Sequence, residues 1–184
     1  MVCHSPPARR NVNGAVNKQP FIVTAILPPD LAHWANTLRT AHYPPDRNYV
    51  KAHVTLFHSL PHFCGDEIRA ALAQEAAGQG PVEAQLSGLA LQDAGNALRL
   101  RSPEMLDVRG RLADRFHGLL TAQDMHEPQL HVTIQNKVTR QEARRLHAQL
   151  EPDIKPRKFQ FLGLGLHIYR GGEWDFVRKY QFRG

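Results

Sequence analysis

The sequence lacks the features that define several classes of protein. The longest apolar run in its first part, Phe21 to Leu27, is too short to cross a bilayer. The segment before it is polar and has no apolar region of the kind found in a secretory signal. We therefore expect no association with a membrane and a cytoplasmic location.

Cysteine is scarce, and the motifs of several catalytic classes are missing. The two cysteines, Cys3 and Cys64, are far apart and belong to no CxxC motif, so they cannot form a structural zinc site unaided. We interpret both as reduced thiols in a reducing compartment. The sequence contains no GxSxG motif, no phosphate-binding glycine loop and no dinucleotide-binding fingerprint. Nothing in it therefore supports a nucleophile-elbow hydrolase, a P-loop enzyme or a Rossmann protein.

One group of potential metal ligands is too small for a site. His58, His62 and Cys64 are close in the sequence, but Pro61 prevents a regular helix there and no fourth ligand is evident. We expect no metal and no other cofactor. Alternation along the strand turns His58 toward the core, where we expect a buried, hydrogen-bonded imidazole.

The composition that remains is that of an ordinary globular protein. The chain has 184 residues, of which 42% are hydrophobic and 22% charged, enough for one domain that needs no disulfide support. Its net charge of +6 favours anionic partners, such as phosphate or nucleic acid. Residues 1–19 are predicted to form a disordered leader, and residues 20–184 a single domain.

Hydrophobic periodicity and turn residues predict alternating strands and helices. Helices are expected from about residue 30 to residue 42, then at 65–77, 103–120 and 139–150. Strands are expected at 21–27, 49–60, 82–91, 97–101, 129–138, 159–169 and 174–182. The last helix begins with a capping box of Thr139 and Glu142. Several neighbouring strands require antiparallel pairing, so the fold class is α+β.

One pattern occurs twice, each time within a predicted strand. His53-Val-Thr55-Leu and His131-Val-Thr133-Ile share the form His-Val-Thr-aliphatic. Residues two apart in a strand point to the same face. Each strand therefore presents an imidazole and a hydroxyl on one face and anchors itself in the core with the other.

The same alternation adds four candidates for substrate contact. Lys51 and Phe57 share the face of the first motif, and Gln135 and Lys137 share that of the second. The lysines would add positive charge. Phe57 would either stack on a base or pack the wall of a cleft.

Two histidines and two hydroxyls on facing strands suit phosphodiester chemistry. One imidazole can take a proton from an attacking water or hydroxyl group, while the other gives a proton to the leaving oxygen. An unperturbed histidine can serve in either role near neutral pH without a metal. The threonine hydroxyls can donate hydrogen bonds to phosphate oxygens in the transition state.

At these motifs the sequence resembles the two-histidine (2H) phosphoesterase superfamily, most closely its branch of 2′-5′ RNA ligases and cyclic phosphodiesterases. The resemblance covers roughly residues 21–182. It implies a bilobal domain in which two pseudo-symmetric α+β lobes face each other across a cleft. It also implies that His53 and His131 are the acid and base, that Thr55 and Thr133 bind phosphate, and that no metal takes part.

The resemblance implies a substrate class: RNA ends or nucleotides that carry a 2′,3′-cyclic phosphate or a 2′-5′ linkage. Hydrolysis and reversible 2′-5′ ligation both remain open. We expect His53 to be the acid at the leaving ribose oxygen and His131 the base for water, in a monomeric protein. The alternative is a non-catalytic module that binds RNA or a nucleotide in the same cleft.

Overall fold

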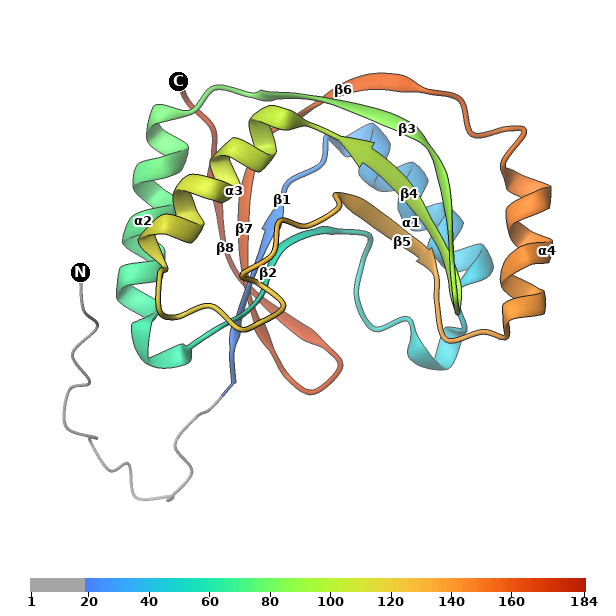
Figure 1. Cartoon of the computed structure of the whole chain (residues 1–184), viewed down its shortest axis with the longest axis horizontal. Coiled ribbons are helices and arrows are strands. Elements are labelled where there is room, and N and C mark those ends of the chain that lie inside the picture. Colours follow the sequence, from blue (N-terminus) through green and yellow to red (C-terminus); the bar gives the residue numbers. More distant parts are fainter. Residues whose placement is uncertain (1–18) are drawn as a thin grey trace.

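Two antiparallel sheets of four strands form the framework of the protein (Figure 1). The computed structural model describes residues 19–184, so the predicted leader lies, except for its last residue, outside the described part. Sheet 1 has the order β2-β1-β7-β8, with β1 (Phe21–Ala25), β2 (Val54–Leu60), β7 (Gly163–Tyr169) and β8 (Trp174–Gln181). Sheet 2 has the order β5-β4-β3-β6, with β3 (Val82–Gln92), β4 (Gly95–Arg101), β5 (His131–Gln135) and β6 (Arg157–Phe161). The predicted α+β class is confirmed.

Four α-helices pack around these sheets. They are α1 (Pro29–His42), α2 (Gly65–Gly78), α3 (Pro103–Arg115) and α4 (Arg140–Leu150), with short 3-10 turns at Pro45–Arg47 and His62–Cys64. Helix α2 packs on β7 and β8, α4 packs on β3 and β4, and α3 contacts both β3 and α2. Helix α1 follows a strand of sheet 1 but packs against β5 of sheet 2, so it joins the two halves. The capping box of Thr139 and Glu142 is present at the start of α4.

The chain passes from one sheet to the other where a single strand was expected. Residues 159–169 form the end of β6 and all of β7, separated by Leu162. The backbone N–H of Leu162 donates to the carbonyl oxygen of Ile26 at 2.9 Å, so the crossing is itself hydrogen-bonded to the segment after β1. The helix expected to reach residue 120 ends at Arg115. A connection without helix or strand, residues 116–130, then leads to β5.

Both motif strands contain a one-residue bulge directly after the threonine. In β2, Thr55 pairs with Thr24 and Phe57 pairs with Val23, so Leu56 is the extra residue. In β5, Thr133 pairs with Ala97 while Gln135 pairs with Asn96, so the extra residue lies at the same place in the motif. A bulge inserts one residue and reverses the side-chain alternation beyond it. The two strands thus share an irregularity as well as a sequence pattern.

The bulges correct three expectations. Phe57 is fully buried and packs edge-to-face on Phe116, with ring centroids 5.6 Å apart, so it does not face a cleft. Gln135 is also buried, and its side-chain oxygen accepts a hydrogen bond from Asn96 at 2.8 Å. His58 turns outward instead of into the core, with 41% of its side chain exposed, although it is hydrogen-bonded as expected.

Cys64 is buried and disulfide-bonded, contrary to the interpretation of a reduced thiol. Cys3, the other cysteine, lies outside the described residues.

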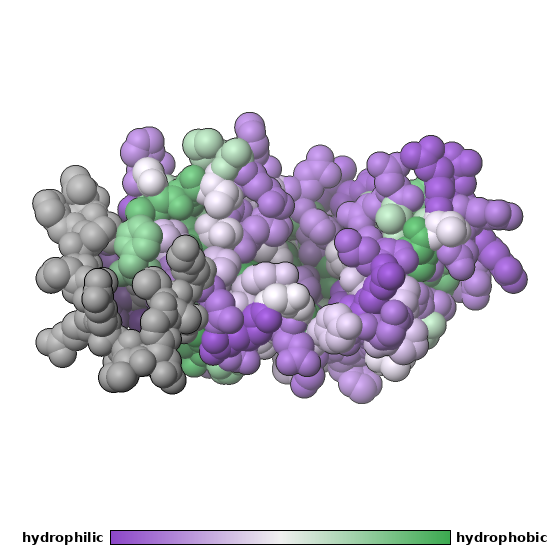
Figure 2. Space-filling view, turned by 90° about the horizontal axis from the view of Figure 1, so that it is seen from below, coloured by the Kyte–Doolittle hydropathy of each residue, from purple (hydrophilic) through white to green (hydrophobic). Residues whose placement is uncertain are grey.

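Within residues 19–184, no helix combines the length and the apolar character needed to cross a bilayer. The face drawn in Figure 2 is largely hydrophilic, and hydrophobic residues show only in small areas. The apolar side chains are instead gathered in a core to which both sheets contribute.

Candidate active site

The two motif histidines are held by the same hydrogen bond. The Nδ1 atom of His53 lies 2.7 Å from the carbonyl oxygen of Lys51, and Nδ1 of His131 lies 2.7 Å from the carbonyl oxygen of Gln129. In each case the partner is the residue two positions earlier. A carbonyl oxygen only accepts, so Nδ1 carries a proton in both rings. Proton exchange with a substrate is therefore left to Nε2 in both histidines.

The fold brings the two motifs together. Strands β2 and β5 belong to different sheets but contact one another. Thr55 and Thr133 are half-buried, as are the histidines two residues before them, whereas the intervening valines are fully buried. Each strand therefore presents its histidine and threonine on one face, as predicted.

Burial lowers the pKa of His53 to about 4. The hydrogen bond to the carbonyl of Lys51 acts in the opposite direction, while the positive charges of Arg39, His167 and His131 lower the pKa further. At neutral pH the His53 imidazole is consequently neutral, with Nε2 unprotonated.

A cavity of about 520 Å³ opens beside His53. Its size is in the range of small-molecule sites. It lies between the segment around residues 49–53, the residues of β1 with their continuation to Leu27, and the β7–β8 hairpin. The lining residues are Thr24, Ala25, Ile26, Leu27, Ala32, Tyr49, Val50, Lys51, Ala52, His53, His167, Trp174 and Phe176. Lys51 is exposed and lines this cavity.

Three rings of the β7–β8 hairpin, which the sequence alone does not single out, lie in this cavity. Trp174 contacts His53, with ring centroids 4.3 Å apart, and His167 lies 5.6 Å from both Trp174 and Phe176. Without a partner nearby in the sequence, His167 is expected to be structural or on the surface. Its partner, Thr24, is 143 residues away, with Oγ1 at 3.1 Å from Nε2 of His167. In the sequence, only the two neighbouring strands expected at 159–169 and 174–182 hinted at this cluster.

Arg39 is a second residue whose role the sequence does not reveal. It lies on α1 and is buried, and its Nη1 donates to the carbonyl oxygen of Thr133 at 2.6 Å. Its Nε and Nη2 donate to Oδ1 of Asn48 at 3.2 and 2.9 Å. The guanidinium therefore fixes the backbone of the second motif to the helix that precedes the first.

Lys137 does not join the other site residues. It follows β5 in a left-handed conformation, with φ of 63°, and its backbone N–H donates to the side-chain oxygen of Asn136. Its side chain is exposed and does not line the cavity beside His53. The structure thus gives no support to its predicted contact with substrate.

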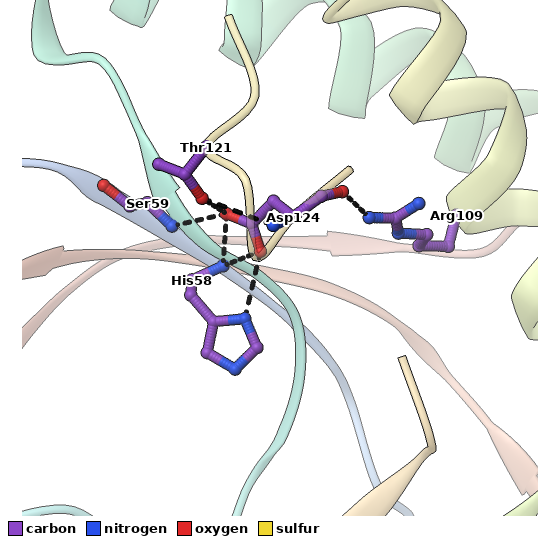
Figure 3. A network of polar contacts seen from close by, with 5 residues as sticks. All are labelled: His58, Ser59, Arg109, Thr121 and Asp124. Atoms are coloured by element: carbon purple, nitrogen blue, oxygen red, sulfur yellow. Dashed lines mark hydrogen bonds and ion pairs between the residues drawn. The ribbon is translucent and has the colours of Figure 1, made fainter. Parts of the chain in front are cut away.

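A buried carboxylate links the connection before β5 to the first motif strand (Figure 3). Asp124 accepts hydrogen bonds from the backbone N–H groups of His58 and Ser59 and from Nδ1 of His58, all within 3.0 Å. Its own carbonyl oxygen accepts from Arg109 of α3. Burial alone would raise the pKa of Asp124, but the hydrogen bonds from His58 and Ser59 outweigh it and lower the pKa. The network ties β2 of sheet 1 to α3, which packs on β3 of sheet 2.

Across residues 19–184, no group of three or more histidine, cysteine, aspartate or glutamate side chains is placed to hold a metal ion. His58 is bonded to Asp124. Catalysis without a metal stays a prediction.

The two-sheet fold and the paired motifs define the class of the protein as a two-histidine phosphoesterase. Residues 27–173 match the sequence model of the 2′-5′ RNA ligase superfamily, and the chain therefore belongs to that superfamily. No curated protein sequence gives a significant match.

Solved structures share the fold at low sequence identity. TT0787 of Thermus thermophilus superposes with a TM-score of 0.62 at 15% identity, covering 90% of this chain and 98% of its own. E. coli LigT, complexed with 3′-AMP, gives a TM-score of 0.63 at 14% identity, covering 91% of this chain and 99% of its own. A protein described as a phosphoesterase gives 0.60 at 13% identity, with 91% and 99% covered. These likenesses establish the bilobal arrangement of the fold.

Proposed function

We propose that the protein is a metal-independent phosphodiesterase that acts on 2′,3′-cyclic phosphates or 2′-5′ linkages of RNA ends and nucleotides. The observation that carries the proposal is the matched pair of histidines, each with Nδ1 bonded to a carbonyl oxygen and Nε2 left to exchange a proton. Membership of the 2′-5′ RNA ligase superfamily and the LigT structure with 3′-AMP support the substrate class. We propose that it acts as a monomer.

In hydrolysis, one water is added and one P–O bond to a ribose oxygen is broken. The basic histidine takes a proton from the water as its oxygen attacks phosphorus, and the acidic histidine gives a proton to the ribose oxygen that leaves. Because the pKa of His53 is about 4, it is neutral at pH 7 and suited to be the base. We therefore assign the base to His53 and the acid to His131, which reverses the assignment expected from the sequence.

We propose that Thr55 and Thr133 hold the phosphate between the histidines. Each hydroxyl lies two residues from a motif histidine on the same face of its strand. Donors aimed at non-bridging oxygens stabilise the negative charge that develops during attack. Lys51 adds a positive charge at the cavity.

Turnover of nucleoside 2′,3′-cyclic monophosphates in excess chelator tests this proposal. We expect the unchanged protein to hydrolyse them and both His53→Ala and His131→Ala to lose turnover. His126→Ala, which removes an exposed histidine outside the site, is the matched control and should retain full activity. Activity that survives both motif substitutions would exclude this site, and activity abolished by chelator would exclude the metal-free mechanism.

The alternative of a non-catalytic binding module predicts a different result. Binding alone needs no pair of histidines with the same tautomer, and the matched hydrogen bonds therefore favour the enzyme. If no phosphoester is turned over while nucleotides bind in a manner that depends on His53, the module is the correct interpretation.

A further inference from the structure

A second cavity, of about 340 Å³, lies between α1 and residues 48–51, the segment that leads to β2. It shares residues 49–51 with the cavity beside His53, and the side chains around it are mostly polar and include no carboxylate. Lys51 therefore lines both cavities, and its carbonyl oxygen holds the His53 ring. The second cavity is thus next to the candidate active site, with a lining of its own on α1.

This cavity contains a buried positive charge that is not balanced by a carboxylate. Arg39, which lines it, is only 4% exposed. Its guanidinium contacts neutral groups: the carbonyl oxygen of Thr133, the side-chain oxygen of Asn48 and the ring of Tyr43. Within residues 19–184 no aspartate or glutamate pairs with it, and burial lowers its pKa. A buried charge is costly unless a group of opposite charge accompanies it.

The other polar groups of the cavity offer donors rather than acceptors. Oδ1 of Asn36 already accepts from a backbone N–H at 2.7 Å, and Oδ1 of Asn48 accepts twice from Arg39. In the described part of the chain, the amide nitrogen of Asn48, the hydroxyl of Thr40 and the ammonium of Lys51 have no hydrogen-bond partner. A phosphate group brings strong acceptor oxygens and the negative charge that Arg39 lacks.

We infer that this cavity binds a second phosphate group, one that is not cleaved, through Arg39, Asn48 and Lys51. The inference rests on the proposed function only for the place of the reacting phosphate, at His53. Because Lys51 lines both cavities, a single nucleotide with two phosphates can occupy them together. The preferred substrate then carries a further phosphate, such as one on its 5′ oxygen, in addition to the one that reacts.

Titration calorimetry with inorganic phosphate tests the site itself. Asn48→Asp keeps an acceptor for Arg39 and supplies the missing carboxylate, so it should lower the number of phosphates bound per chain by one. Its resistance to urea should not fall, because the variant gains an ion pair. Gln141→Glu, which makes the same change of charge on the exposed side of α4, is the matched control. If Asn48→Asp binds as many phosphates as this control, the inference is wrong whatever the turnover.

Thr40→Val is a second, milder variant. Thr40 is exposed on α1, and the substitution removes one donor of the cavity without breaking a hydrogen bond of the described chain. It should weaken the binding of inorganic phosphate about fivefold. An affinity equal to that of the unchanged protein would contradict the site.

Turnover distinguishes a phosphate of the substrate from free phosphate. Adenosine 2′,3′-cyclic phosphate that carries a 5′-phosphate should have a KM about tenfold lower than the same compound without it, and Asn48→Asp should remove this advantage. If phosphate binding is lost in Asn48→Asp but the 5′-phosphate has no effect on KM, the cavity binds free phosphate. Phosphate binding that depends on Asn48 without turnover of any cyclic phosphate would support the site and refute the proposed enzyme.

Discussion

At the scale of single residues, the site is defined by how two histidines are held. Each donates from Nδ1 to a backbone carbonyl, so the tautomer of the neutral ring is set by the main chain and not by a second side chain. Burial beside the Trp174 ring and the charge of Arg39 make the charged form of His53 costly. His53 can therefore accept a proton at pH 7 without first losing one.

The pH dependence of kcat/KM should show this difference. That parameter reports the pKa values of the free enzyme. With His53 as the base, activity is lost as pH falls through its pKa of about 4, well below the 6.5 of an unperturbed histidine. Replacing Trp174 by alanine lets water reach the ring and should move this acid limb toward 6.5. An acid limb that stays near the unperturbed value in the unchanged protein would contradict the base role of His53.

The motif threonines should contribute to kcat through their hydroxyls. Thr55→Val and Thr133→Val keep the shape of the side chain but remove the donor, and each should lower kcat by about 10²-fold, as for other single donors to an anionic transition state. Serine at either position should restore much of the rate. Thr37→Val, on the exposed face of α1, is the control without an expected effect. If the valine variants are as active as the control, the threonines are structural.

At the scale of strands and turns, both motifs lie where the sequence predicts, but the residues beyond them break the expected alternation. Alternation placed Phe57 and Gln135 beside their histidines, and the bulge after each threonine turned both inward. In the first strand, the two adjacent apolar residues directly before His58 already indicated that the alternation of buried and exposed side chains changes there. In the second strand, Gln135 is polar, and its burial depends on a partner, Asn96, from another strand.

Other parts of the site could not be predicted because their contacts are distant in the sequence. His167 is hydrogen-bonded to Thr24, which is 143 residues away in the sequence. Arg39 is hydrogen-bonded to the carbonyl oxygen of Thr133, which is 94 residues away. Strand and helix positions depend on local patterns, and most were expected within a few residues. The division of residues 159–169 between two sheets depends on the pairing of β6 with β3 and of β7 with β1.

The connection before β5 should depend on Asp124. Asp124→Ala leaves several backbone and side-chain donors of His58 and Ser59 without their acceptor, and it should lower the free energy of unfolding by about 3 kcal/mol. Asp93→Ala, which breaks an exposed ion pair with Arg140, should cost less than about 1 kcal/mol. Urea denaturation of both variants measures the difference. Equal losses would show that the network does not stabilise the fold.

This carboxylate also predicts the direction of an effect of pH on stability. The pKa of Asp124 is lower in the folded protein, so the stability it provides is complete above its unfolded pKa and is lost as pH falls through the folded value. The lowered pKa of His53 acts in the same direction, because the unfolded chain binds a proton there at a higher pH. Asp124→Ala should therefore show a smaller loss of stability between about pH 6 and pH 3 than the unchanged protein.

At the scale of the whole molecule, the two sheets are joined at the site itself. Helix α1 lies in the chain between two strands of sheet 1 but packs on β5, and Arg39 bonds it to the second motif. The Asp124 network makes a separate connection between β2 and the elements around α3. The two motif strands are thereby linked by buried contacts.

Unfolding should accordingly be a single cooperative transition. Tryptophan fluorescence, which reports on Trp34 and Trp174, and far-ultraviolet circular dichroism should give coincident urea curves. Arg39→Met should lower the free energy of unfolding by about 2 kcal/mol and also reduce kcat, because Thr133 loses its tether. Arg47→Met, at an exposed ion pair, is the control. Separate transitions for the two probes would show that the halves fold independently.

The shared tautomer of the two histidines has a consequence for the direction of the reaction. Both histidines present Nε2 to the substrate, so they can exchange the roles of acid and base in the reverse reaction. The acid of one direction is the base of the other. No part of the site needs to rearrange for this exchange. Under the proposed function, the group beside the phosphorus would then decide whether a linkage is opened or made: water would give cleavage, and a ribose hydroxyl of a second strand would give joining.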